Sequence, residues 1–143
     1  MCVQKTAFPV DARALLPHEG SMCCIDRLLS SSKTAATSEA SLHAGHSLLT
    51  DGVLELTGCI ELAAQTAGAM QGFDQAIQGL PPKAGFLVGV QDFILRDVAH
   101  AGDTVRMEVC IIAELGEMTV LSANIFHQET LLAEGRLKVY VPE

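Results

Sequence analysis

Residues 57–73, TGCIELAAQTAGAMQGF, form the stretch that decides the fold. Within it, Cys59, Ala63, Ala67 and Met70 recur at spacings of four, four and three, which is the period of one helix face. No proline interrupts the stretch. Its many alanines and glycines allow other elements to approach closely on every side, because these residues project little beyond the backbone. The pattern therefore predicts one long helix that is wrapped by other elements.

The regions on both sides of this helix have strand patterning. Two C-terminal stretches alternate apolar and polar residues with period two, which is typical of half-buried antiparallel strands. Short turns are predicted at residues 116–117 and 128–130, and GLPP at residues 79–82 breaks the chain after the helix. Residues 17–20, PHEG, predict another turn before the first strand. The predicted strands include residues 22–29, 35–43, 105–114 and 131–141.

One long helix followed by a meander of strands predicts an α+β fold, with an antiparallel sheet wrapped around one central helix. This arrangement is the hot-dog fold. At 143 residues, 49% of them apolar, the chain is long enough for one domain, 1–143, with its own core. No internal repeat is visible.

Charge and cysteine content restrict the possible partners. The formal net charge of −8 repels phosphate backbones and anionic lipid headgroups, so nucleic acid and membrane partners are not expected. An acidic carrier protein could still dock on a local patch of cations. The five cysteines are odd in number and lack metal-binding spacing, and no apolar run is long enough for a membrane span. We therefore expect a cytoplasmic protein.

Three motifs, in order along the chain, resemble those of the 3-hydroxyacyl-[acyl-carrier-protein] dehydratase family. They are LLPH at residues 15–18 followed by DR at 26–27, ELAAQTAG at 61–68, and Arg96 followed by GD at 102–103. The resemblance spans most of the chain.

Two further segments, GFLVG at residues 85–89 and LKVYVP at 137–142, look most like the small dehydratases of aryl-polyene type clusters. The histidine loop of the family, GHFPG, corresponds here to GHSL at residues 45–48, so both the proline and the second glycine are missing.

The resemblance implies an enzyme that dehydrates 3-hydroxyacyl thioesters on acyl carrier protein to trans-2-enoyl thioesters, as in fatty acid or polyketide biosynthesis. This lyase reaction needs a base and an acid on either side of the substrate. His46 is the expected base and Glu61 the expected acid, since an imidazole can accept a proton and a carboxyl group in an apolar wall can retain one. In the family the two groups come from different subunits, beside an acyl tunnel. The resemblance therefore implies a homodimer or higher assembly, a phosphopantetheine-linked substrate, and neither metal nor redox cofactor.

Other residues are candidates for substrate binding. Gln65 lies four residues after Glu61 and shares its helix face. The first exposed amides of the helix, near Leu56 and Thr57, could polarise the thioester carbonyl. Arg96 is a candidate contact for the carrier or its phosphopantetheine.

Several alternatives remain open. His43, three residues before His46, is a second candidate base. A hot-dog acyl thioesterase would use Glu61 as base or nucleophile without needing His46. A non-catalytic acyl-binding partner subunit would need neither group. The acyl chain length and the identity of the carrier are left unassigned.

Overall fold

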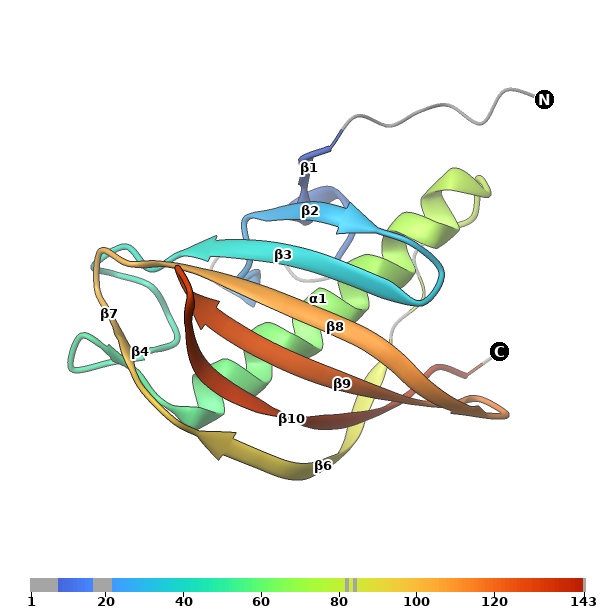
Figure 1. The fold of residues 1–143 in the computed structure, drawn as a ribbon. Helices are drawn as coiled ribbons and strands as arrows, with labels where there is room; N and C mark the ends of the chain where they lie inside the picture. Colours follow the sequence, from blue (N-terminus) through green and yellow to red (C-terminus); the bar gives the residue numbers. More distant parts are fainter. Residues whose placement is uncertain (1–7, 17–21, 82, 84, 143) are drawn as a thin grey trace.

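The fold consists of one long helix and two antiparallel sheets. The structure is a computed structural model that describes all residues except 1–7, 17–21, 82, 84 and 143. The larger sheet has the strand order β1-β2-β3-β8-β9-β10-β6 and wraps around α1 (Figure 1). Its strands are β1 (Val10–Asp11), β2 (Arg27–Ser31), β3 (Ala35–Ser41), β6 (Phe86–Leu95), β8 (Thr104–Leu115), β9 (Met118–His127) and β10 (Thr130–Tyr140). The smaller sheet joins β4 (Leu49–Thr50), β5 (Val53–Leu54) and β7 (Ala99–His100).

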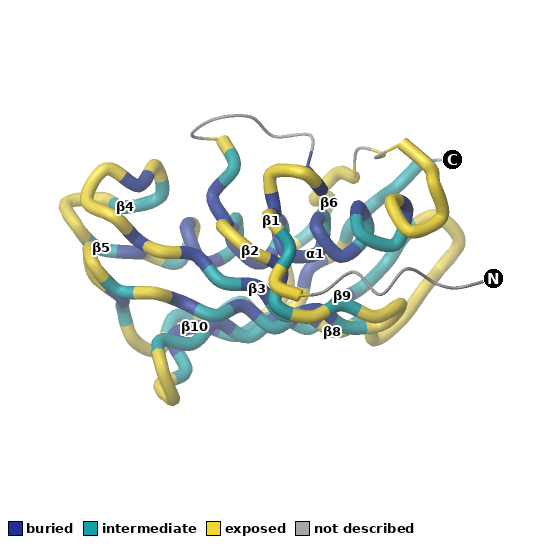
Figure 2. The backbone as a smooth tube through the Cα atoms, turned by 90° about the horizontal axis from the view of Figure 1, so that it is seen from above, coloured by how far each residue is buried: buried dark blue, intermediate teal, exposed yellow. Residues whose placement is uncertain are grey.

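The predicted central helix is confirmed, and the fold is the expected hot-dog arrangement. Helix α1 spans Leu56–Ile77, one turn beyond the predicted end, and stops where Gly79 adopts a φ of +72°. Leu62, Ala63 and Ala69 are fully buried against the sheet. Seen from above, buried residues concentrate along α1 and the parts of the strands that face it, whereas the chain turns are exposed (Figure 2).

The predicted C-terminal strands are also found. The stretches 105–114 and 131–141 correspond to β8 and β10, and Gly116, with a φ of +63°, lies in the two-residue turn that joins β8 to β9. The predicted strand 35–43 ends at Ser41. The turn predicted at residues 17–20 lies outside the described residues.

The first predicted strand, residues 22–29, differs from the structure because β2 starts only at Arg27. The apolar run before it is extended, but part of its backbone bonds to the helix instead of to a strand. In particular, the Cys24 N–H donates to Gln65 Oε1 at 2.7 Å. A helix side chain has therefore taken the place of a strand neighbour.

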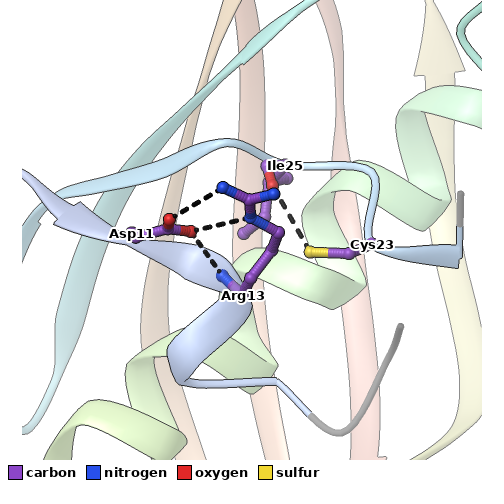
Figure 3. A network of polar contacts seen from close by, with 4 residues as sticks. All are labelled: Asp11, Arg13, Cys23 and Ile25. Atoms are coloured by element: carbon purple, nitrogen blue, oxygen red, sulfur yellow. Dashed lines mark hydrogen bonds and ion pairs between the residues drawn. The ribbon is translucent and has the colours of Figure 1, made fainter. Parts of the chain in front are cut away.

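A short 3-10 helix, η1 (Ala12–Ala14), precedes this segment and is capped by Asp11 (Figure 3). The Asp11 carboxylate accepts hydrogen bonds from the Arg13 backbone N–H at 2.9 Å and from its guanidinium at 3.1 Å. The side-chain hydrogen bond from Arg13 lowers the pKa of Asp11. Nearby, the Cys23 thiol donates to the Ile25 carbonyl at 3.5 Å. These contacts hold the conformation of η1 and of the segment at Cys23, both of which precede α1 in the chain.

Gly72 of α1 lets the lead-in chain approach the helix backbone directly. A Cβ at this position would lie 2.1 Å from the Leu15 carbonyl oxygen, well inside van der Waals contact. The neighbouring Leu16 is buried and packs on Gly68, where a Cβ would lie 3.1 Å from its Cδ2. Small residues on this helix face therefore decide where residues 15 and 16 can lie.

We expect Gly72→Ala to destabilise the protein by about 1–3 kcal/mol, because the backbone of Leu15 must move. Urea unfolding measures this loss. Gly45→Ala is the matched control, since a Cβ there has only one neighbour, at 3.9 Å. Equal stability of Gly72→Ala and the wild type would contradict the packing of the lead-in chain on α1.

Strand β6 forms one edge of the larger sheet and is apolar on both faces. It pairs with β10 on one side only. Its exposed apolar side chains are Phe86, Leu87, Val88, Val90 and Ile94. An open, apolar strand edge of this kind is a template for pairing with another chain.

Candidate functional site

Gln65 and Glu61 lie one turn apart on α1, and their side chains are hydrogen-bonded. Gln65 is 2% exposed and Glu61 is half-buried. The Gln65 amide nitrogen donates to Glu61 Oε2 at 2.9 Å and to the Met22 carbonyl at 2.8 Å, while its oxygen accepts from the Cys24 N–H. Both amide hydrogens and the amide oxygen are therefore engaged, which fixes the orientation of Gln65. Through Gln65, one oxygen of Glu61 is held in place.

The second oxygen of Glu61, Oε1, has no hydrogen-bond partner within the described residues. Glu61 lines a hollow of about 160 Å³ between α1 and the start of β6. Leu16, Lys83 and Leu87 line the same hollow. Glu61 Oε1 is therefore available to a molecule that enters this hollow.

His46 is a buried polar residue of this region and is 8% exposed. Its Nε2 lies 2.9 Å from the Cys24 carbonyl oxygen, and its Nδ1 lies 3.2 Å from the Leu48 N–H. A carbonyl can only accept, so Nε2 carries the proton, and an N–H can only donate, so Nδ1 offers its lone pair. His46 is thus held as the neutral imidazole with its basic atom at Nδ1.

One residue, Cys24, joins the two candidate catalytic groups. Its N–H is bound by Gln65, and its carbonyl is bound by His46. A hydrogen-bonded series therefore runs from Glu61 through Gln65 and the Cys24 peptide groups to His46. The series positions both groups on one backbone segment, although His46 does not line the Glu61 hollow.

Three further candidates, Leu56, Thr57 and His43, lie close along the chain to Glu61 or His46. Leu56 and Thr57 begin α1 after Glu55, whose side chain makes no capping hydrogen bond. The first amides of a helix have no partner within it, and Thr57 lies one turn before Glu61. His43 is exposed, with its ring centroid 5.4 Å from that of His46.

Arg96 lies apart from the Glu61 hollow. Its Nε donates to Glu134 Oε2 at 2.5 Å, and it lines a separate depression that also contains Arg136 and Asp92. The two depressions share no lining residue. Within one chain, Arg96 is therefore not brought together with Glu61 or His46.

Cys59, two residues after Thr57, is fully buried. Burial raises the pKa of its thiol to about 11, so the thiol stays protonated near neutral pH. Cys59 therefore fills the core, and it is not a nucleophile. Cys23, Cys24, Cys59 and Cys110 are all free thiols.

Sequence reasoning missed three parts of the site. Cys24 and Met22 take part through backbone groups, which every residue carries and no side-chain pattern reveals. Gln71, which also lines the Glu61 hollow, had a visible signal. It continues the series Glu61, Gln65, Gly68 at helical spacing on the same face of α1.

The described residues contain neither a metal-binding cluster nor a membrane-spanning helix. No group of three or more His, Cys, Asp or Glu side chains in this part of the chain is placed to hold a metal ion. Among the same residues, no helix has both the length and the hydropathy required to cross a bilayer.

Comparison with solved structures shows which folds this chain shares. The dehydratase heterocomplex ApeI:P from Xenorhabdus doucetiae matches with a TM-score of 0.86 at 20% identity, covering 96% of this chain and 93% of the other. Protein PH1136 from Pyrococcus horikoshii matches with a TM-score of 0.69 at 16% identity, covering 96% of each chain. A hypothetical thioesterase from Streptococcus pneumoniae TIGR4, solved with coenzyme A, matches with a TM-score of 0.63 at 12% identity, covering 80% and 84%. At these identities the likeness shows the fold alone.

Sequence comparison identifies the family. No curated protein matches the chain. The family model described as ApeP dehydratase matches residues 10–143, which is nearly the whole chain and includes every candidate residue discussed above. The chain therefore belongs to the ApeP-like dehydratase family.

Proposed function

We propose that this protein removes water from 3-hydroxyacyl thioesters carried by acyl carrier protein and forms the trans-2-enoyl thioester. The observation that carries the proposal is the series from Glu61 through Gln65 and Cys24 to His46. In each protomer it orients the Glu61 carboxyl group and the His46 imidazole, and dehydration requires an acid and a base of these kinds. Membership in a dehydratase family supports the same reaction.

The proposed reaction moves two protons. His46 Nδ1 takes the proton from the carbon beside the thioester carbonyl, and the electrons of that C–H bond form the new double bond. The bond from the next carbon to its hydroxyl breaks, and Glu61 gives its proton to the departing oxygen, so water leaves. Proton exchange then restores neutral His46 and protonated Glu61. No electron is gained or lost, so the reaction requires no redox cofactor, and His46 and Glu61 carry out both proton transfers.

The surrounding backbone supports this assignment of roles. The Cys24 carbonyl keeps the first proton of His46 on Nε2, and it stabilises the imidazolium once Nδ1 is also protonated. The Leu48 N–H has to part from Nδ1 before Nδ1 can take the substrate proton, and the 3.2 Å length of this hydrogen bond favours the separation. The amides near Leu56 and Thr57, at the positive end of α1, would stabilise negative charge on the thioester oxygen.

We also propose that the working unit is a homodimer, or a larger assembly, joined at the β6 edge, with acid and base contributed by different protomers. Two observations support pairing at this edge. Strand β6 has an open side with exposed apolar residues, and the structurally similar ApeI:P is a dehydratase heterocomplex, so a related fold works as an assembly of chains. The Glu61 hollow begins at β6, through Leu87, so a second chain at this edge would border the site.

A charged residue on the β6 edge is expected to separate the protomers. We expect Val88→Asp to yield a smaller species in light scattering and to lose dehydration, because pairing would bury the carboxylate. Leu115→Asp is the control, since Leu115 is the most exposed large apolar residue of the described chain and lies on the hairpin end of β8. A folded wild-type monomer that still dehydrates substrate would contradict the shared site.

The depression around Arg96 is the candidate docking site for the acyl carrier protein. Arg96 and Arg136 provide positive charge in a net acidic protein, beside Glu134 and Asp92. Such a patch could hold the acidic carrier or the phosphate of its phosphopantetheine arm. A cytoplasmic location, where acyl carriers work, fits this partner.

One assay separates dehydration from its rivals. The protein is incubated with a 3-hydroxyacyl carrier substrate, and intact mass spectrometry follows loss of water from the carrier while a thiol reagent follows release of free thiol. We expect loss of water without free thiol. Free thiol without enoyl product would indicate a thioesterase, and binding without either would indicate an acyl-binding subunit.

The thioesterase is the second candidate, favoured by the burial of His46 and by the engagement of both its ring nitrogens. In that reaction the free oxygen of Glu61 would act as base or nucleophile at the thioester. A non-catalytic acyl-binding partner subunit is favoured by the same feature of His46.

A further inference from the structure

Two buried hydroxyl groups, those of Ser38 and Thr66, join β3 to α1. Both residues are fully buried, and their side-chain oxygens lie 2.6 Å apart. The register neighbours of Ser38 on β2 and β8, Leu28 and Met107, are apolar and fully buried. Thr66 also donates to the Leu62 carbonyl, one turn earlier on α1, at 2.8 Å. Because this bond uses the Thr66 proton, Ser38 is the donor to Thr66 Oγ1.

Apolar packing alone specifies the rotation of α1 weakly. Ala36 and Ala40, the other buried residues of β3, are small, and so are many buried residues of the helix: Gly58, Cys59, Ala63, Ala67 and Ala69. Small side chains interdigitate little, so neighbouring rotations of the helix bury similar apolar area. A buried hydrogen bond is directional and is satisfied in only one of these rotations. The bond from Ser38 to Thr66 therefore selects one orientation of α1 on the sheet.

Strand β3 also holds the segment that contains Cys24. The Asp26 N–H donates to the Glu39 carbonyl at 2.9 Å, and Glu39 directly follows Ser38. Farther along β3, the Ser41 N–H donates to the Asp26 carboxylate at 2.6 Å. One strand therefore fixes both the helix, through a side chain, and the Cys24 segment, through backbone groups.

The helix and the Cys24 segment meet at Gln65, so the hydrogen bonds form a closed ring. Gln65 directly precedes Thr66 on α1, and its amide oxygen accepts from the Cys24 N–H at 2.7 Å. The Cys24 segment then returns to β3 through Asp26. Successive residues of a helix point about 100° apart, so a rotation that breaks the Thr66 contact also turns Gln65 away from Cys24.

We propose that Ser38 and Thr66 are positioning residues, which set the rotation of α1 so that Gln65 binds the Cys24 peptide and holds Glu61 in its reacting orientation. The proposal rests on the proposed function for the reaction that this orientation serves. Neither residue lines the Glu61 hollow, so both act on the site through Gln65.

The first test is deuterium exchange of the Cys24 amide, followed by NMR, which needs no turnover. The variant Ser38→Ala/Thr66→Val removes both hydroxyls together, so no buried polar atom loses its partner and the fold is retained. We expect its Cys24 amide to exchange at least about tenfold faster than in the wild type, while the amides of β9 keep their wild-type rates. Unchanged exchange at Cys24, or equal acceleration in β9, would overturn the proposal.

Ser31→Ala is the matched control for the loss of a hydroxyl. Ser31 lies on β2, and its oxygen is buried but has no hydrogen-bond partner within the described residues. We expect wild-type exchange at Cys24 and a wild-type reaction rate in this variant. Faster Cys24 exchange in Ser31→Ala would overturn the specific role of the bond between Ser38 and Thr66.

The second test measures water loss from a 3-hydroxyacyl carrier substrate. We expect Ser38→Ala/Thr66→Val to lower kcat by about ten- to a hundredfold with little change in KM, because the acid is misplaced while the substrate contacts remain. Thr66→Ser retains the hydroxyl and should recover most of the wild-type kcat. A rise in KM with unchanged kcat would overturn the positioning role.

The two tests distinguish failure of this proposal from failure of the proposed function. Faster Cys24 exchange in the double variant of a protein that removes no water would uphold the positioning of Gln65 and refute dehydration. Wild-type exchange and wild-type kcat in the double variant would refute the positioning role and leave dehydration intact. If the double variant does not fold, Ser38→Ala repeats both measurements, since it leaves the Thr66 bond to Leu62 in place.

Discussion

Glu61→Gln is expected to remove dehydration while leaving the fold intact. The amide has the shape of the carboxyl group, and its oxygen can still accept the hydrogen bond from Gln65 that Glu61 Oε2 now accepts. It cannot give a proton to the departing hydroxyl. Because a general acid contributes on the order of 10²–10⁴ in rate, enoyl formation should fall by about that factor.

The measurement is the rate of water loss from a 3-hydroxyacyl carrier substrate, with thermal unfolding as the check on the fold. Glu108→Gln makes the same chemical change on β8, where Glu108 pairs with Arg106, and should keep the wild-type rate. If Glu61→Gln also kept that rate, Glu61 would serve only to hold Gln65. If thiol release fell instead of water loss, the thioesterase would be the correct function.

The fold could be predicted because burial leaves a periodic record in the sequence. The spacing of Cys59, Ala63, Ala67 and Met70 indicated the helix, and all four residues are buried in it. The alternation in the first half of β8 similarly reports one face on the core, whereas in β10 the neighbours Leu132 and Ala133 are both buried, where a register shift interrupts the alternation. These patterns arise from contacts within one chain, which hydropathy records directly.

The departures from prediction arise where a polar side chain competes with strand pairing. The apolar run that contains Cys24 resembles a strand, yet Gln65 and His46 bind its peptide groups and β2 begins later. Strand β6 is the opposite case. Its first half, FLVGV at residues 86–90, has the apolar composition of a buried strand, but in one chain most of it is exposed, and we attribute its composition to a second chain.

The candidate site could be predicted residue by residue but not as an arrangement. The motifs suggested Glu61, Gln65 and His46, whereas their connection through the Cys24 backbone has no signature in side-chain type. For Arg96, the motif predicted a place near the substrate that the structure of one chain does not show. Its motif suggested a role near the substrate, and the structure pairs it with Glu134 in a separate depression, so its contact with a carrier stays a prediction.

His46→Ala is expected to abolish enoyl formation, by about the factor that a general base contributes, on the order of 10²–10⁴. The change removes the Nδ1 lone pair that would take the substrate proton. It also removes the hydrogen bond to the Cys24 carbonyl, which positions the segment that Gln65 holds. A loss of activity in this variant alone would therefore fit either a base or a structural residue.

His46→Gln separates these two roles. Its side-chain amide can still donate to the Cys24 carbonyl, but it has no basic nitrogen to take a proton at Nδ1. A base at position 46 predicts that both variants are inactive, whereas a structural residue predicts that His46→Gln recovers the wild-type rate. His43→Ala should stay close to wild type, because His43 is exposed and its backbone hydrogen bond from the His46 N–H survives the change. Full enoyl formation in His46→Ala together with its loss in His43→Ala would transfer the base to His43. Full enoyl formation in both variants would refute a histidine base and leave Glu61 as the one candidate catalytic group.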